Sequence, residues 1–142
     1  STQYTGGEAV YYLIIKQNKM GSPLMHARSS ARKYGGDFND YIAIHKWFDS
    51  TKGHLANFRH RCILHNSFGM LLAEQVFGDY VTNSEGKMVE VRQIAYDHIY
   101  EDCGKVPTIE DWLQNLQPQP WMMKADETRK RKVELDLETI KQ

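Results

Sequence analysis

The chain has 142 residues, 41% hydrophobic and 25% charged, which is enough for one domain with a hydrophobic core and excludes an intrinsically disordered protein. Eighteen lysines and arginines balance eighteen aspartates and glutamates, so the strong positive field typical of nucleic-acid-binding proteins is absent. The apolar run 9–15 is too short to span a membrane and the two cysteines have no paired spacing, so we expect a cytoplasmic protein with reduced thiols.

The N-terminal half is predicted to contain an extension and two helices. Residues 1–21 are interpreted as an N-terminal extension, either native or added, since Met20 offers an alternative start. Ser22-Pro23 is typical of a helix start and Gly35-Gly36 of a helix end. A second helix is predicted from about residue 40 to residue 52.

The longest predicted helix covers about 57–77. Its apolar residues occupy most of the circumference, which predicts that it is buried at the centre of the domain. Residues 80–91 form two short alternating runs around a turn-forming Asn-Ser-Glu-Gly sequence, which predicts a β-hairpin. Further helices are predicted over 91–103 and 109–116. The fold class is therefore mainly α: a compact helical bundle around the 57–77 helix, with a small hairpin at 80–91, in a single domain over 22–122.

The remaining residues, 123–142, are predicted to form a charged C-terminal helix. Val133, Leu137 and Ile140 make a narrow apolar stripe on it. The basic run 129–132 has no aromatic neighbours, so we interpret it as a solvated face rather than a nucleic-acid contact. Because ordered chain ends are usually tied to something, we expect the tails to dock on a second copy of the chain or on another protein partner.

Histidines and carboxylates recur at one-turn spacing on the predicted helices. His98 and Asp102 share the apolar face of the 91–103 helix, and His45 and Asp49 lie on the edge of the apolar face of theirs. Each pair is open to two interpretations. It is either a hydrogen-bonded pair that stabilises the fold or part of a metal or catalytic site.

The 57–77 helix carries two more histidines. His65 is predicted to point inward, as either a core histidine or a third ligand. His60 lies on another side, between Arg59 and Arg61, where basic groups could hold a phosphate or a carboxylate. His26 and His54 are predicted to be ordinary surface residues.

Together these positions predict a divalent-metal centre of open metal identity, because helical proteins build such centres from histidines and carboxylates on several helices. The first-choice ligands are His65, His98 and Asp102, with His45 and Asp49 as further candidates.

In the catalytic form of this hypothesis, Lys52, Arg59 and Arg61 orient the anionic group of a substrate. His60 then acts as a general acid or base near neutral pH. The alternative hypothesis is a non-catalytic assembly subunit, in which the polar interior only defines the fold and the tails dock on partners.

Four stretches resemble, in this order, a family of small uncharacterised bacterial and phage proteins: PLMHARSSARKYGG (23–36), YIAIHKWFDSTK (41–52), NFRHRCILHNSFG (57–69), and 98–121 with EDCGKVPTIEDWL and QPW. The resemblance covers about 22–122. It implies a compact single domain of unknown function and carries no catalytic residues over.

The chain is also similar to helical His-Asp phosphohydrolases in the order of its residues. A histidine comes first, then a helix with His45 and Asp49-x-x-Lys52, and later another histidine and aspartate. This similarity implies a metal-dependent hydrolase acting on a nucleotide or another phosphorylated substrate. The chain departs from that pattern, because those proteins carry an adjacent His-Asp pair whereas three residues separate His45 from Asp49 here.

Overall fold

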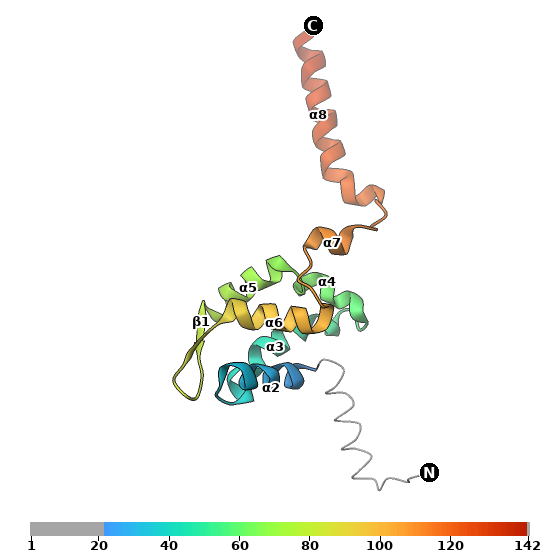
Figure 1. Cartoon of the computed structure of the whole chain (residues 1–142). Coiled ribbons are helices and arrows are strands. Elements are labelled where there is room, and N and C mark those ends of the chain that lie inside the picture. The colour runs from blue at the N-terminus through green and yellow to red at the C-terminus, as the bar shows by residue number, and fades with distance from the viewer. Residues whose placement is uncertain (1–21, 142) are drawn as a thin grey trace, which may run out of the picture. The chain divides into compact units, whose positions relative to one another are not determined.

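The structure is a computed structural model that describes residues 22–141, and the chain divides into two compact units between Trp112 and Leu113. The predicted N-terminal extension, 1–21, lies outside the described residues. In the first unit, α6 (Val91–Cys103) runs between α5 (Ser67–Phe77) on one side and α2 (Pro23–Tyr34) and α3 (Ile42–Asp49) on the other (Figure 1). The predicted mainly α fold is confirmed.

Short elements connect these helices. They are the 3-10 turns η1 (Phe38–Asp40), η2 (Ser50–Gly53) and η3 (Phe58–His60), the single-turn helix α4 (Arg61–Leu64), the strands β1 (Tyr80–Thr82) and β2 (Met88–Glu90), and α7 (Ile109–Leu113) at the boundary between the units.

The boundaries of α2 follow the local signals in its sequence. Ser22 Oγ accepts a hydrogen bond from the backbone N–H of Met25 at 3.3 Å, and Pro23 occupies the first helical position. The helix ends at Gly35, whose φ of 85° is in the region that favours glycine. The predicted helix start and end are therefore confirmed.

The helix at the centre of the first unit is α6. Val91, Ile94 and Ile99 are fully buried on it, and Ile44 and Phe48 of α3 belong to the same hydrophobic core. In α5, by contrast, only Gly69 and Ala73 are buried. The central buried helix of the unit is therefore α6 and not the predicted 57–77 helix.

The prediction of one continuous helix over 57–77 is wrong, because the helix is interrupted at His65 and Asn66. Asn66 is extended (φ −154°, ψ 172°), and its Oδ1 accepts from Gly69 N at 2.8 Å, which caps the start of α5. Its Nδ2 donates to the carbonyl of Cys62 at 3.0 Å and so closes the end of α4. One side chain therefore ends a helix and begins the next, and α5 leaves Phe68, Leu71 and Val76 exposed.

The predicted hairpin is confirmed at β1 and β2. The strands pair antiparallel with Val81 opposite Val89. Asn83 is buried in the turn between them, where its Oδ1 accepts from the backbone N–H groups of Glu85 and Lys87 at 3.0 and 2.9 Å. Its Nδ2 donates to the carbonyl of Tyr34 at 3.2 Å, which ties the hairpin to the end of α2.

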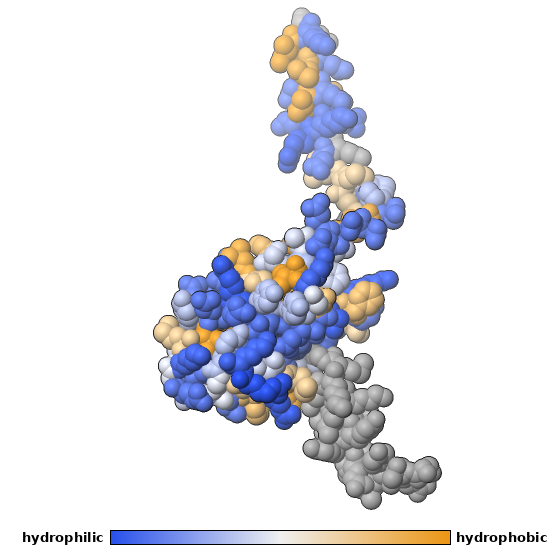
Figure 2. All heavy atoms as spheres, in the orientation of Figure 1, coloured by the Kyte–Doolittle hydropathy of each residue, from blue (hydrophilic) through white to orange (hydrophobic). Residues whose placement is uncertain are grey.

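The second unit contains η4 (Pro120–Met123) and α8 (Lys124–Lys141). Figure 2 shows hydrophobic residues along one side of α8 and hydrophilic residues over the rest of the face in view. None of the described helices is both long and apolar enough to cross a membrane.

Candidate metal centre

Four side chains from three separate segments, one of them α6, meet in the interior of the first unit. His98 and Asp102 lie one turn apart on α6, Asp49 ends α3, and His65 follows α4. One nitrogen or oxygen atom from each lies within 4.8 Å of the others. The side chains of both histidines are fully buried and that of Asp102 is 3% exposed, so the four groups are enclosed by protein.

The distances between these atoms fit coordination of one ion. His65 Nε2 lies 3.1 Å from His98 Nε2, and Asp102 Oδ2 lies 2.9 and 3.3 Å from those two nitrogens. Asp49 Oδ1 is 3.6 Å from His65 Nε2 and 3.5 Å from His98 Nε2. Ligands about 2.05 Å from a metal are about 3.3 Å apart in a tetrahedron and about 2.9 Å apart in an octahedron. The site therefore has the dimensions of a divalent-metal centre.

The break after α4 brings His65 into this group. His65 has φ −82° and ψ 64°, which leaves the helical region and turns its imidazole toward α6. Trp112 Nε1 donates to the carbonyl of His65 at 2.9 Å and holds the bend from outside. The feature that the 57–77 prediction missed is thus the one that positions a candidate ligand.

The protonation of the two carboxylates also suits a cation. Burial would raise the pKa of Asp102, but the hydrogen bonds from His26, His65 and His98 lower it. Burial would also raise the pKa of Asp49, but the contact with His98 and the charge of Lys52 lower it. Both carboxylates are therefore ionised at neutral pH.

Burial lowers the pKa of His65, which favours the uncharged form that can bind a metal. Asp49 Oδ2 has no hydrogen-bond partner among the described residues. Two buried carboxylates, one with an oxygen that lacks a donor, leave negative charge that a divalent ion would balance.

The prediction that His26 is an ordinary surface residue is wrong. Its side chain is 2% exposed, with Nε2 3.1 Å from Asp102 Oδ1 and Nδ1 2.6 Å from Glu101 Oε2. Burial alone would lower the pKa of His26, but these two carboxylates raise it to about 9. His26 is therefore a buried cation that supports Asp102. The small residues Ala27 and Ser30 beside it on α2 are the signal of close helix packing that could have indicated its burial.

His45, predicted as a further ligand, lies behind His98. Its Nδ1 is 2.8 Å from His98 Nδ1, and its Nε2 is 2.8 Å from Ser30 Oγ. Burial, together with the neighbouring imidazoles of His98 and His26, lowers the pKa of His45 to about 2, so it is uncharged. With His26 and His98 it makes a second group of three histidines, beside the four atoms at the centre.

The predicted catalytic residues lie at different distances from the centre. Lys52 Nζ is 3.8 Å from Asp49 Oδ2 and Arg61 Nη2 is 3.9 Å from Asp102 Oδ1, and both side chains are partly exposed. His60 is buried against His65, with ring centroids 5.6 Å apart, and its Nδ1 is 2.9 Å from Thr51 Oγ1. Arg59 is exposed on η3.

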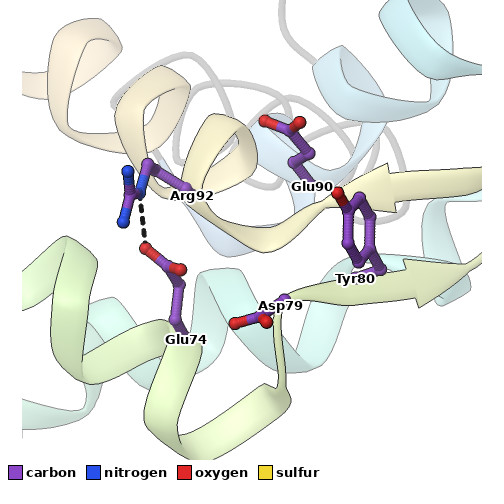
Figure 3. Close-up of a pocket in the computed structure, with 5 residues that line it drawn as sticks. All are labelled: Glu74, Asp79, Tyr80, Glu90 and Arg92. Carbon is purple, nitrogen blue, oxygen red and sulfur yellow. Dashed lines mark hydrogen bonds and ion pairs between the residues drawn. The ribbon is translucent and has the colours of Figure 1, made fainter.

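A surface pocket lies apart from this cluster, where α5, β1 and α6 meet (Figure 3). Arg92 Nε donates to Glu74 Oε1 at 2.6 Å across it. The remaining lining residues are Asp79, Tyr80 and Glu90. None of them belongs to either histidine group, so the pocket is a separate feature of the surface.

The fold and the cluster together describe a small helical domain with a buried His/Asp centre. The chain belongs to the family described as domain of unknown function DUF6915, whose model matches residues 21–122. No curated protein and no solved structure matches the chain. The resemblance to an uncharacterised family is thus confirmed over nearly the expected range, and the similarity to His-Asp phosphohydrolases stays a prediction.

Proposed function

We propose that this domain binds one divalent metal ion and uses it to hydrolyse a phosphorylated substrate. The observation that supports metal binding is the convergence, at coordination distances, of four ligand atoms from three separate segments: Asp49 Oδ1, His65 Nε2, His98 Nε2 and Asp102 Oδ2. An ion in this position would lower the pKa of a bound water and polarise a phosphoryl oxygen.

Two partly exposed cations support an anionic substrate. Lys52 Nζ is 3.8 Å from Asp49 Oδ2 and Arg61 Nη2 is 3.9 Å from Asp102 Oδ1, and both cations are partly exposed, so positive charge extends from the centre toward the surface. Arg61 Nε is buried and has no hydrogen-bond partner among the described residues. A guanidinium with a free donor suits a phosphate oxygen, which Arg binds through two N–H groups.

His60 is suited to the role of general base. Burial lowers its pKa, so the ring is uncharged at neutral pH. Its Nδ1 contacts Thr51 Oγ1, which leaves Nε2 as the nitrogen that could accept a proton.

Metal analysis tests the first part of the proposal. Protein purified without chelators should contain about one divalent ion per chain, and adding Mn²⁺ or Zn²⁺ to the metal-free protein should raise Tm. At a hundredfold excess over Kd the stabilisation is about 2.7 kcal/mol, which corresponds to several degrees. Replacing the exposed His54 by alanine should leave the shift intact, whereas His98→Ala should remove it. No bound ion and an unchanged Tm would contradict the proposal.

The hydrolase part has its own test. The metal-loaded protein is incubated with a panel of nucleotides and phosphomonoesters, and released phosphate is measured. Arg61→Met should retain the metal and raise KM for the substrate that is cleaved. Absence of phosphate release across the panel, with the metal bound, would leave a metal-binding domain without this activity.

A second candidate function, self-assembly through the C-terminal helix, is favoured by the pattern on α8. Val133, Leu137 and Ile140 are spaced four and three residues apart and are 53%, 53% and 80% exposed. This is the spacing of the core positions of a coiled coil. In a parallel pair in register, Arg129 would face Glu134 of a second copy and Asp136 would face its Lys141, so the flanking charges attract.

Light scattering on the full chain tests this candidate. We expect a dimer that Leu137→Glu converts to a monomer, because the substitution places charge in the apolar stripe. Leu135→Glu is the matched control, since Leu135 is 55% exposed on the same helix and lies on the opposite side from the stripe. A monomeric wild-type chain, or equal effects of the two substitutions, would count against assembly through α8.

A further inference from the structure

Behind the centre, hydrogen bonds connect three buried side chains, those of His98, His45 and Ser30, in series. His98 presents Nε2 to the centre, and its other ring nitrogen, Nδ1, lies 2.8 Å from Nδ1 of His45. His45 Nε2 in turn lies 2.8 Å from Ser30 Oγ. All three side chains are at most 2% exposed, so water does not compete for these contacts.

The proton between His98 and His45 can belong to either ring. When His98 Nδ1 donates to His45 Nδ1, His45 Nε2 carries its own proton and donates to Ser30 Oγ. The Nε2 of His98 then has a free lone pair toward the centre. In the reverse direction His98 Nε2 keeps a proton, which points toward Asp102 Oδ2 at 3.3 Å and blocks a metal. Only the first direction is compatible with His98 as a ligand.

His45 cannot share the ion with the four candidate ligands through the nitrogen that faces His98. The two nitrogens of one imidazole direct their lone pairs to different sides of the ring, so a group bonded to His98 Nδ1 lies away from the ion that Nε2 would bind. His45 therefore occupies the second layer around the centre, where hydrogen-bond partners of ligating histidines are found in metal sites generally.

We infer that His45, supported by Ser30, is a positioning residue that holds His98 in the Nδ1–H tautomer, with Nε2 free to bind a divalent cation. This inference rests on the proposed metal binding, and it gives His45 a role other than the ligand role predicted from the sequence. Ser30 supports this arrangement because its Oγ accepts the hydrogen bond that His45 Nε2–H donates.

Nitrogen NMR on the wild-type protein loaded with Zn²⁺ tests the tautomers directly. We expect His98 to be protonated at Nδ1 and metal-bound at Nε2, and His45 to be protonated at Nε2 with an unprotonated, metal-free Nδ1. A metal-bound His45, or a proton on His45 Nδ1, would overturn the inference. A wild-type chain that binds no Zn²⁺ would instead refute the proposed metal binding itself, so the two failures are distinguishable.

Substitution gives a second measurement. His45→Phe preserves a ring of similar size without the acceptor, and it should weaken Zn²⁺ binding about 10- to 100-fold in a competition assay. His45→Gln, which keeps a side-chain acceptor, should recover part of that loss. Ile44→Val is the matched control, because Ile44 is buried beside His45 on α3 and has no polar contact with His98. It should lower Tm without changing Zn²⁺ affinity. Equal affinities in wild type and His45→Phe would overturn the inference.

Discussion

Asp102→Asn is expected to abolish metal binding and to destabilise the metal-free protein by about 3–5 kcal/mol, the usual cost of removing one partner from a buried ion pair. The carboxylate is 3% exposed and its two oxygens contact three imidazoles, those of His26, His65 and His98. An amide has one acceptor oxygen and no charge, so at least one buried imidazole loses its partner. Urea unfolding of the metal-free variant measures the cost.

Asp49→Asn is the matched comparison. It should abolish metal binding as well, but it should lower metal-free stability by only about 1 kcal/mol or less. The reason is that Asp49 Oδ2 has no hydrogen-bond partner among the described residues and its nearest cation, Lys52, is 46% exposed and 3.8 Å away. Equal losses of stability in the two variants, or metal binding by either, would contradict this division of roles.

The pH dependence of the wild-type chain has a definite sign. Because the pKa of Asp102 is lowered in the folded state, its contribution to stability is fully present above the unfolded value of about 4 and is lost as the pH falls below it. Asp102→Asn should therefore show a weaker loss of stability on acidification than the wild type.

Much of the fold is predictable from the sequence because its signals are local. The proline after Ser22, the glycine at position 35 and the turn residues before Gly86 determine where elements begin and end over a few residues. The helix interruption at Asn66 was not predicted because an asparagine can either continue a helix or cap the ends of two helices. Which of these occurs depends on neighbours that tertiary packing brings close. An apolar circumference therefore did not imply one buried helix.

The site residues, too, were predictable only where their contacts are local in the sequence. The pair of His98 and Asp102 is visible in the sequence because one helical turn separates them. His26 escaped prediction, since its partners lie 75 and 76 residues further along the chain and only packing of α2 against α6 brings them together. Which ring nitrogens of His98 and His45 carry protons depends on the positions of individual atoms, and residue spacing carries no information about them.

Gly69→Ala is expected to destabilise the protein by about 3 kcal/mol, although alanine normally stabilises a helix by about 1 kcal/mol relative to glycine. A Cβ at this position of α5 would lie 1.7 Å from the carbonyl oxygen of Leu64 and 2.7 Å from its carbonyl carbon. Both atoms are backbone, so no side-chain rotation relieves the clash. The end of α4 must move away from α5, against the cap that Asn66 provides.

The same substitution should weaken metal binding, because Leu64 directly precedes His65 and any shift of its carbonyl group displaces the imidazole from the centre. Thermal unfolding and Zn²⁺ titration of Gly69→Ala measure the two effects. Gly53→Ala is the control: a Cβ there has no atom within 4 Å, so stability and affinity should stay at wild-type values. If Gly69→Ala were as stable as Gly53→Ala, the contact between α4 and α5 would be looser than the structure describes. The bend that positions His65 would then need another cause.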